Sequence, residues 1–556
     1  MSRRLSGAAL GAAVSLIGVL GLSGVTASPA HAATWPQPDQ VAGPQPTFSY
    51  RYDPQTVVLP DGTTVASWAD TGGLDQIMVA EHPVGGSWST PVPVAPANVW
   101  GNRLALGPDG TLAIVYQNIV ASKIEVGAVV RPAGGAWSSP ETISDTTTSA
   151  SSPQVAVGAG QVTAIFLQGS GTAAQPVVRM RPLAAGPWTA PQVFADTGVT
   201  SPGVAAGPAG TVVTWVLPSL PPPASYPAST VRSSFLPASG LWETPVSVSA
   251  SDRRVTSAEP AVGVDGTLAV VWESRVPDIA GYYETAQVWA ALRPATGSWG
   301  PGTLLSDPSV EGRMPHVGVG PDGATTVVWE SYDGATEKVA TRTYRAGSWA
   351  PEELLTQSVD AQSQPLLAVA PDGTAVVSLS DLEHGYGVAI RPPGGSWRPT
   401  DYVAPPEQTG YYRAVAVGGS TVAVVWVSSQ DDVLLAVVAD GLLPLPPLPP
   451  PPPSTPRPET GPVTGPKKVD QGDKAAYAFT GTPASVTYQC RVDETRRQQT
   501  GVTGKPGKKP VPWHTCSSPT KVKTKKLKVG RHTLYVRAVL GDVPDPTPSE
   551  KRFKVT

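Results

Sequence analysis

Two glutamates stand at the same point in two copies of one short phrase, and their type and spacing could support acid–base chemistry. Glu273 and Glu330 each follow a tryptophan in the phrase Val-Trp-Glu-Ser. Two carboxyl groups held about 5–10 Å apart across a concave surface can cleave a glycosidic bond. The alternative is that both glutamates are solvated carboxylates in loops. The sequence leaves both interpretations open.

Other catalytic and metal-binding signatures are absent from the sequence. It contains no Gly-x-Ser-x-Gly, no Gly-x-x-x-x-Gly-Lys and no His-Glu-x-x-His. Its histidines show no ligand spacing, and no Asp-x-Asp-x-Asp-Gly loop is present. We therefore expect neither a metal nor a cofactor, and we lean against enzymatic activity. Any catalysis would rest on carboxylates.

A repeated unit dominates the chain and would have to position these residues. Half of the unit is a Gly-x-Trp phrase, whose successive tryptophans are 48 to 57 residues apart. The tryptophans are Trp88, Trp137, Trp188, Trp242, Trp299, Trp349 and Trp397. In a repeat architecture each unit buries its faces against its neighbours. We therefore interpret these side chains as packing residues between units, with sugar stacking as the alternative.

The other half of the unit is a tight turn followed by a strand that ends in an aromatic residue. Asp-Gly between two apolar runs favours a hairpin, because glycine accepts a positive φ angle. The clear copies are Asp61-Gly62 with Trp68, Asp109-Gly110 with Tyr116, Asp265-Gly266 with Trp272, Asp322-Gly323 with Trp329 and Gly418-Gly419 with Trp426. Degenerate copies lead to Phe166 and Trp215, and Asp372-Gly373 has Ser378 at the expected aromatic position.

Four antiparallel strands in about 50 residues are typical of a β-propeller blade. Eight turn units are present, and the last ends near Asp440 without a fourth strand. Trp35-Pro36-Gln37-Pro38 matches the start of a tryptophan phrase, so we expect the N-terminal segment to supply that strand and close the ring. The sequence predicts an all-β, eight-bladed β-propeller over residues 33–440, with seven blades as the alternative.

The composition agrees with this fold class. The 556 residues include 57 glycines and 63 prolines, which break helix interiors and argue against a helical bundle. A hydrophobic content of 40% and 16 tryptophans argue against a disordered chain.

Polar residues are expected to gather at one mouth of the propeller. Chain leading into the innermost strand and chain leaving the second strand emerge on the same face. The residues that leave the second strand include Asp70, Glu273 and Glu330. The residues that lead into the innermost strand, which we predict to form a ligand-binding face, are Arg51, Asn102, Arg103, Glu259, Arg313, His316, Tyr411, Tyr412 and Arg413.

Residues 1–32 have the features of a secretory signal peptide. Arg3 and Arg4 precede an apolar run, and Ala30-His31-Ala32 is a cleavage site. The arginine pair leaves the choice between the general and the twin-arginine export routes open. No later segment approaches the ~20 apolar residues that span a bilayer. We expect an extracellular, secreted protein without a transmembrane anchor, held at a cell surface, if at all, by other means.

A proline-rich segment, residues 441–466, is expected to link the propeller to a basic domain over residues 467–556. Such a segment favours the extended polyproline II helix and acts as a spacer. Residues 467–556 contain 19 Lys and Arg against 7 Asp and Glu, whereas residues 33–466 contain 19 against 36. The lysines predicted to bind an anionic surface are Lys505, Lys508, Lys509, Lys521, Lys523 and Lys525. Lys521, Lys523 and Lys525 alternate and would share one face of a strand; a merely solvated face is the alternative.

Both cysteines, Cys490 and Cys516, lie in the basic domain. In an exported protein such a lone pair is most simply a disulfide. Tyr488-Gln489-Cys490 and the segments 513–519 and 530–538 resemble a secreted bacterial Ig-like module. That resemblance implies a β-sandwich used for adhesion or spacing, without catalysis.

The Asp-Gly-Thr…Trp units resemble the repeats of sialidase-type and other secreted propellers. The resemblance implies the fold. That family's arginine triad and Tyr–Glu nucleophile pair have no counterparts that can be placed in this sequence, so its activity is not implied.

These features predict a secreted, non-catalytic binding protein. Its propeller face would recognise an extracellular glycan or protein, and its basic domain would dock to an anionic cell-envelope polymer. We expect a monomer that does not bind nucleic acid, because no recognition helix or base-stacking motif accompanies the lysines. The first alternative is a glycoside hydrolase or lyase that uses Glu273 and Glu330. A purely structural envelope protein is the second.

Overall fold

The chain divides into two compact units, residues 1–446 and 447–556. The computed structural model describes residues 35–443 and 458–556, apart from 45–49, 72–74, 97–98, 184–185, 220–227, 239, 278–283, 357–363, 382, 430–431, 483, 494, 498–507, 542 and 546. The predicted signal peptide therefore lies outside the described residues. Within them, no helix is long and apolar enough to cross a membrane.

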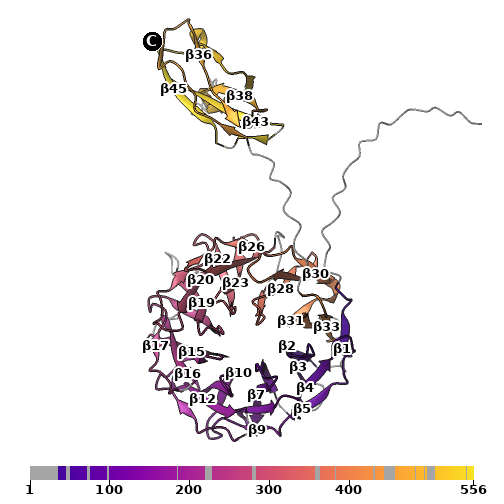
Figure 1. Cartoon of the computed structure of the whole chain (residues 1–556). Helices are drawn as coiled ribbons and strands as arrows, with labels where there is room; N and C mark the ends of the chain where they lie inside the picture. The colour runs from indigo at the N-terminus through magenta and orange to yellow at the C-terminus, as the bar shows by residue number, and fades with distance from the viewer. Residues whose placement is uncertain are drawn as a thin grey trace, which may run out of the picture. The chain divides into compact units, whose positions relative to one another are not determined.

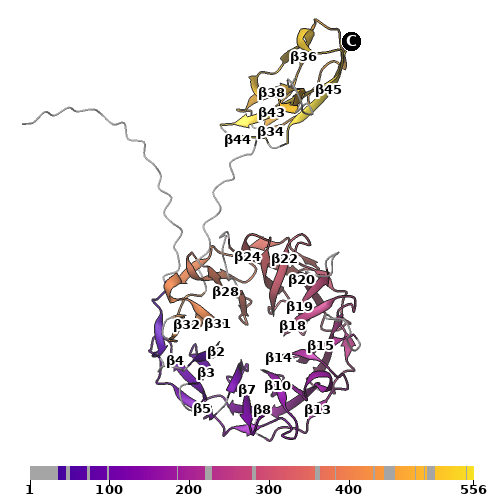
Figure 2. The same ribbon diagram turned by 180° about the vertical axis from the view of Figure 1, so that it is seen from behind.

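The first unit is built from antiparallel sheets of four strands, one of which carries a fifth, arranged radially (Figures 1 and 2). Each sheet is named here by its innermost strand. The first sheet contains β2 (Arg51–Val58), β3 (Thr64–Asp70), β4 (Gln76–His82) and β5 (Val92–Pro96), and the second contains β6 (Val99–Leu106), β7 (Leu112–Val120), β8 (Lys123–Arg131) and β9 (Glu141–Thr142). The third contains β10 (Ala150–Gly158), β11 (Gln161–Gln168), β12 (Gln175–Pro182) and β13 (Gln192–Val193), and the fourth contains β14 (Thr200–Gly207), β15 (Gly210–Pro218), β16 (Ser229–Pro237) and β17 (Val246–Ser247).

The remaining sheets of this unit follow in chain order, and the last takes its outermost strand from the N-terminal segment. The fifth sheet contains β18 (Arg254–Val262), β19 (Leu268–Pro277), β20 (Glu284–Arg293) and β21 (Thr303–Leu304), and the sixth contains β22 (Glu311–Val319), β23 (Thr325–Tyr332), β24 (Glu337–Arg345), β25 (Ser348–Trp349) and β26 (Glu353–Leu354). The seventh contains β27 (Leu366–Val369), β28 (Ala375–Asp381), β29 (Gly385–Arg391) and β30 (Asp401–Ala404), and the eighth contains β31 (Gly410–Gly418), β32 (Thr421–Ser428), β33 (Leu434–Ala439) and β1 (Asp39–Ala42). Two single-turn 3-10 helices, Gly171–Ala173 and Pro406–Gln408, lie in connections.

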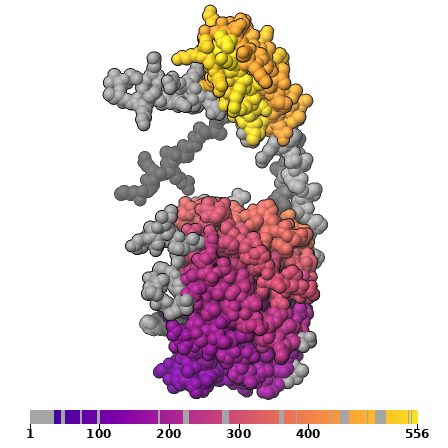
Figure 3. All heavy atoms as spheres, turned by 90° about the vertical axis from the view of Figure 1, so that its left-hand side faces the viewer, coloured from indigo at the N-terminus to yellow at the C-terminus, as the bar shows by residue number. Residues whose placement is uncertain are grey.

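The innermost strands contact one another in a closed circle. The order is β2, β6, β10, β14, β18, β22, β27, β31 and back to β2. Seen from the side, the outer wall of this unit is closely filled by side chains (Figure 3). Radial sheets whose inner strands close a circle are the arrangement of a β-propeller.

The ring closes where the sequence analysis predicted. β1 pairs with β33, with Asp39 opposite Ala436, so the first described strand completes the last sheet. In Figure 1 the indigo β1 lies beside the orange β33. The Trp35 Nε1–H also donates to Asp401 Oδ2 at 3.2 Å, which ties the N-terminal segment to the neighbouring β27 sheet. Pairing of this kind covers the edge of β33.

The Asp-Gly turns connect the first and second strands as predicted. In the turn after β2, the Gly62 N–H donates to Leu59 O at 2.9 Å, and Gly62 has a φ of 88°. The Asp61 carboxylate accepts the Thr63 N–H at 2.9 Å. Glycine is required here because side chains are strained at such a φ, and the aspartate closes the turn through its own side chain.

The core lies between adjacent sheets, where the tryptophans pack as the repeat pattern predicted. Trp68, Trp215, Trp329 and Trp426 are each fully buried. Between β18 and β22, for example, Trp329 packs with Val271 and Ala290. Of the Gly-x-Trp tryptophans, Trp188 and Trp397 are 8% exposed. The other five, Trp88, Trp137, Trp242, Trp299 and Trp349, are partly buried against the cores between sheets.

The second unit is a small β-sandwich. One sheet has the order β35 (Lys468–Val469), β45 (Ser549–Val555), β43 (Gly530–Leu540), β38 (Thr487–Val492) and β41 (His514–Cys516), with β44 (Val543–Pro544) beside β43. Separate pairs are β36 (Lys474–Tyr477) with β42 (Thr520–Lys523), β34 (Glu459–Thr460) with β37 (Gly481–Thr482), and β39 (Thr495–Arg497) with β40 (Lys508–Pro510). Tyr477 and Val522 share one core with Val536 and Phe553 of the larger sheet.

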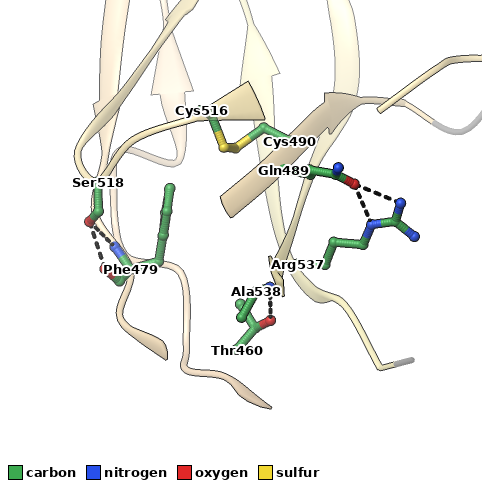
Figure 4. Close-up of a disulfide and its surroundings, with 8 residues drawn as sticks. All are labelled: Thr460, Phe479, Gln489, Cys490, Cys516, Ser518, Arg537 and Ala538. Atoms are coloured by element: carbon green, nitrogen blue, oxygen red, sulfur yellow. Dashed lines mark hydrogen bonds between the residues drawn. A yellow bond between two sulfur atoms is a disulfide. The ribbon is translucent and has the colours of Figure 1, made fainter. Parts of the chain in front are cut away.

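The predicted disulfide between Cys490 and Cys516 is present (Figure 4). Its Cα atoms are 5.8 Å apart, and Cys490 is 1% exposed. It joins the neighbouring strands β38 and β41 within one sheet. This differs from the disulfide of antibody domains, which links two facing sheets.

The structure corrects the expected start of the second unit. The linker was expected to run to residue 466, but β34 already pairs with β37 at Glu459–Thr460. The Thr460 hydroxyl accepts the Ala538 N–H at 2.7 Å (Figure 4). It also donates to Asp545 Oδ2 at 2.6 Å. These side-chain bonds carry no periodic signal, so composition alone placed the boundary too late.

Candidate functional site

A shared bulge shapes the mouth of the propeller. The pairing of innermost and second strands shifts register near the start of β2, β6, β10, β14, β18, β22 and β31. At five of these bulges one residue has a positive φ between 48° and 73°: Asp53, Gly101, Ser152, Ser201 and Met314. A bulge bends its strand and re-aims the next side chains. It therefore determines which residues reach the mouth.

A cavity of about 360 Å³ opens between β18 and β22, at the mouth. It is lined by Thr256, Ser257, Ala258, Glu259, Glu273, Met314, Pro315 and His316. We call it the β18–β22 cavity. It brings together Glu259, His316 and Glu273 of the predicted residues, and the bulge at Met314 forms part of its wall.

Glu259 and His316 form an ion pair across this cavity. His316 Nδ1 lies 2.7 Å from Glu259 Oε2, and Glu259 Oε1 accepts the Val317 N–H at 3.3 Å. Burial lowers the pKa of His316, but the charge and hydrogen bond of Glu259 outweigh it and raise the pKa above its ordinary value of 6.5. Arg413 acts in the opposite direction and lowers it. The pair thus places an imidazole and a carboxylate in the wall of the cavity.

Glu273 is buried and fully engaged in the protein. It is 6% exposed. Its Oε1 accepts the Thr256 hydroxyl at 2.9 Å and Arg275 Nε–H at 3.0 Å, and its Oε2 accepts the backbone N–H of Met314 at 3.1 Å. The carboxylate therefore connects its own sheet to the bulge of the next one. A general acid or base would first have to give up some of these bonds.

Glu330 is in the equivalent place on the neighbouring sheet and is 4% exposed. Its Oε1 lies 3.7 Å from Arg313 Nη1. Arg313 also bonds Glu311 at 2.5 Å and lies over the Tyr332 ring at 4.9 Å. Burial lowers the pKa of Arg313, but its carboxylate neighbours raise it overall. The two predicted glutamates are thus both buried, each with an arginine beside it.

Two residues predicted for the ligand-binding face are instead structural. Arg51 is 7% exposed, and its Nη1–H groups donate to Gly43 O at 2.5 Å and to Asp432 O at 2.7 Å. Asn102 is 0% exposed and its Nδ2–H donates to Ser67 Oγ at 3.0 Å. Buried polar groups need such partners. The bulge at Gly101 directly precedes Asn102, whereas Arg51 lies before the bulge of its own strand; strand alternation alone predicts neither buried side chain.

The other predicted residues differ in accessibility. Arg103 donates to Asn102 O at 2.8 Å, and Tyr412 is 44% exposed. The side chain of Tyr411 lies outside the described residues. Arg413 donates to Gln364 O at 2.6 Å and lies over the Tyr386 ring at 4.8 Å. Burial lowers its pKa to about 10, so it stays charged near neutrality.

The sequence analysis missed a polar cluster at the end of β28. Asp381 is 1% exposed; it accepts the Tyr402 hydroxyl at 2.9 Å, and His384 Nδ1 lies 3.2 Å away. The His384 and Tyr402 rings are stacked at 4.8 Å. Although burial opposes it, hydrogen bonds from Tyr402 and the backbone lower the pKa of Asp381. Asp381 ends its strand nine residues after the turn residue Asp372 and two residues after the core residue Leu379. Asp70 has the same spacing from Asp61 and Trp68, so the repeat itself could have revealed Asp381.

The predicted lysines of the second unit separate into two groups. Lys521 and Lys523 are exposed on β42, with Val522 buried between them, as the alternation predicted. Lys523 lies directly opposite Lys474 of β36. Lys525 does not share the strand, because Thr524–Lys526 forms a 3-10 turn whose Thr524 is buried. Lys505 and the side chains of Lys508 and Lys509 lie outside the described residues.

Among the described residues, no group of three or more His, Cys, Asp or Glu side chains is placed to hold a metal ion.

Comparisons with known proteins give similarity to solved structures only. No family model matches the chain, and no curated protein does. A PL25 ulvan lyase bound to -[GlcA(1-4)Rha3S]- is 10% identical, with a TM-score of 0.43 over 71% of this chain and 94% of that one. A GH93 α-L-arabinofuranosidase of Fusarium graminearum with arabinobiose is 14% identical, with a TM-score of 0.33 over 62% and 93%. An Aleuria aurantia lectin with Fucalpha1-6GlcNAc is 12% identical, with a TM-score of 0.30 over 56% and 97%.

Proposed function

We propose that this chain is a secreted, non-catalytic binding protein that recognises an extracellular glycan at the mouth of an eight-bladed propeller. The β18–β22 cavity carries the proposal. It is concave and offers the Glu259 carboxylate and the His316 imidazole, polar groups that suit hydroxyl-rich ligands. A protein ligand at the same mouth is the second form of the proposal. The eight blades are the eight radial sheets closed by β1.

The engagement of Glu273 supports binding over catalysis. Both of its oxygens accept hydrogen bonds from Thr256, Arg275 and Met314. A carboxylate held in this way stabilises the wall of the cavity rather than acting as a general acid or base. The alternative, a glycoside hydrolase or lyase, would need Glu273 and Glu330 to reach the substrate within the separation that glycosidic cleavage requires.

The test is retention and product analysis with the full chain. Affinity electrophoresis in gels that contain bacterial or plant polysaccharides measures binding, and mass spectrometry of the soluble fraction detects cleavage. We expect retention by at least one polymer, loss of retention in His316→Ala, and no released oligosaccharide. His384→Ala is the matched control, because that histidine also pairs with a carboxylate but does not line the cavity. Released oligosaccharide that disappears in Glu273→Gln or Glu330→Gln would make the protein an enzyme.

We further propose that the second unit, which we interpret as Ig-like, docks to an anionic polymer of the cell envelope. Its exposed β36–β42 face places Lys474 opposite Lys523, beside Lys521. Among the described residues these three lysines form no ion pair. Polygalacturonate can serve as the anionic probe, and Lys521→Ala with Lys523→Ala should weaken binding at low salt. Polygalacturonate binding that is unchanged by both the substitutions and ionic strength would refute docking by charge.

A further inference from the structure

An arginine recurs at one position of the propeller and fills the space between sheets. It stands at the end of the third strand, opposite the first residue of the second strand, as Arg131, Arg293 and Arg391, or one residue further in, as Arg181 opposite Val162. Each reaches back to the preceding sheet. Their partners there are Glu81 for Arg131, Glu141 for Arg181, Glu243 for Arg293, and Thr326 and Thr343 for Arg391. In three of these sheets the guanidinium also lies over an aromatic ring, at 5.1 to 5.6 Å.

Four sheets lack this arginine, and a cavity lies beside two of the residues that replace it. His82 stands at the position in the β2 sheet and Ala439 in the β31 sheet. Pairing places Leu236 at the position in the β14 sheet and Tyr344 in the β22 sheet. A cavity of about 460 Å³ lies beside Leu236, and one of about 630 Å³ lies beside Tyr344. Both lie at the end of the sheets where a turn joins the first and second strands, away from the β18–β22 cavity. In both, the guanidinium that fills this position in the sister sheets is absent.

The larger cavity, between the turn ends of the β18 and β22 sheets, has an aromatic wall. The Tyr344 and Trp349 ring centres are 5.4 Å apart at 61°. Trp349 follows Tyr344 after five residues, whereas Trp137 follows Arg131 after six. The shorter connection is a tight turn in which Ala346 and Gly347 have φ values of 51° and 89°. It folds the tryptophan back beside the tyrosine.

Charged groups face this aromatic wall. Asp265 and Asp322 come from the Asp-Gly turns of two neighbouring sheets, and both are exposed and line the cavity. Arg345 Nη2 lies 2.8 Å from Asp322 Oδ2. The Asp265 oxygens accept the Thr267 N–H and hydroxyl at 2.9 and 2.7 Å, and each oxygen can accept a second bond. Two carboxylates and one guanidinium leave a net negative charge.

We propose that this second cavity binds a neutral pyranose residue of a glycan, independently of the mouth. The apolar face of a sugar ring packs against an aromatic side chain, while its hydroxyls donate to carboxylates and accept from the guanidinium. The net charge disfavours uronic acids, since two like charges would be brought together with partial loss of solvent. The cavity beside Leu236 serves as an internal comparison, because Met180, Leu236 and Trp242 line it and no acidic residue does.

The decisive variant restores the arginine that the sister sheets carry. Tyr344→Arg should fill the cavity without unfolding the protein, since the same residue fits at four equivalent positions. Thr303 lines the cavity and offers a hydroxyl, as Thr343 does for Arg391. Leu236→Arg is the matched control and fills the other cavity. Asp322→Asn, at an exposed turn, removes a carboxylate from the proposed site without filling it.

The measurement is isothermal titration calorimetry of the full chain with the methyl pyranosides of glucose, galactose and mannose, and with glucuronate. We expect at least one neutral sugar to bind, its association constant to fall about tenfold or more in Tyr344→Arg and in Asp322→Asn, and Leu236→Arg to bind as the parent does. Absence of binding by every neutral probe, equal binding in Tyr344→Arg, or tighter binding of glucuronate would overturn the proposal. The same titrations in a His316→Ala background separate this site from the one at the mouth, because the losses caused by Tyr344→Arg and Asp322→Asn should persist there.

Discussion

At the scale of single residues, side chains at equivalent positions of the repeat have different roles. Glu273 and Glu330 stand in the same four-residue phrase, yet Glu273 bonds the neighbouring bulge through Met314. Arg51, in the predicted ligand face, instead holds the closing segment through Gly43 O. A side chain at the mouth can thus stabilise the ring or present chemistry, and its partners decide which.

Glu273→Gln should destabilise the first unit. The amide has one acceptor oxygen in place of two, so either the Met314 N–H or the Thr256 and Arg275 pair loses its partner. An unsatisfied buried group costs about 1–3 kcal/mol. Urea unfolding followed by tryptophan fluorescence measures this, because every tryptophan except Trp513 belongs to the first unit.

Glu353→Gln is the control for that experiment, since Glu353 is exposed on β26. Exposed substitutions change the free energy of unfolding by about 0.5 kcal/mol or less. Equal unfolding midpoints in Glu273→Gln and Glu353→Gln would show that the bonds of Glu273 do not stabilise the ring.

The Glu259–His316 pair should make the stability of the first unit depend on pH. Folding raises the pKa of His316 above 6.5, so its contribution is complete below that pH and is lost as the pH rises through the folded pKa. In Glu259→Gln only burial and Arg413 remain, and both lower the pKa. We therefore expect the free energy of unfolding to fall above pH 6.5 in the parent and not in the variant.

Asp493→Asn is the control for the pH dependence. Asp493 pairs with His532 at 2.7 Å in the second unit, where the pKa of His532 is also raised. Its substitution should leave the fluorescence-detected profile of the first unit unchanged. A Glu259→Gln profile that follows the parent would mean that another group is responsible.

At the scale of elements, the repeat pattern predicted strands and turns better than it predicted side-chain directions. The Asp-Gly turns, the buried tryptophans and the closing strand follow from local chemistry and periodicity. The inward turn of Asn102 follows from a bulge at Gly101, which has a φ of 73° and no distinct signature beyond a glycine. A register shift of one residue therefore leaves the predicted fold correct but makes the predicted site residues wrong.

One register error in the sequence analysis shows this directly. Ser378 was expected at the aromatic position of its unit, but the core position is Leu379, which is 0% exposed and seven residues after Asp372, as Trp68 is after Asp61. Because this unit has no aromatic residue, nothing in its sequence marked which residue occupies the core position. Asp381 was missed for the same reason.

Lys523→Glu should stabilise the second unit while weakening its binding to polyanions. Lys523 and Lys474 are directly opposite on antiparallel strands, and like charges in such a pair are destabilising. An opposite-charge pair would contribute about 0.2–1 kcal/mol. Calorimetric unfolding and gel retention by polygalacturonate measure the two effects.

Lys521→Glu is the matched control, because Lys521 faces Ala476 across the strands. It should weaken polyanion binding similarly without stabilising the sandwich. Equal unfolding temperatures for the two variants would show that the Lys474–Lys523 pair does not destabilise the second unit.

At the scale of the whole molecule, the ring depends on a strand from the other end of its own sequence. Val41 of β1 is 5% exposed and packs with Leu434 and Val425, while Gln40 is exposed on the same strand. Val41→Asp should bury an unpaired carboxyl group at the closure and lower the free energy of unfolding of the first unit by about 2–4 kcal/mol. Gln40→Asp adds the same group to the exposed side and should cost little.

Loss of closure should have a consequence that an ordinary core substitution lacks. Without β1, the edge of β33 presents unpaired backbone groups, which recruit other chains. We therefore expect Val41→Asp to form concentration-dependent oligomers in light scattering, with the calorimetric transition of the second unit unchanged. A monomeric Val41→Asp protein with lowered stability would show that Val41 contributes only to packing. Equal stability of the two variants would show that the ring holds without this strand.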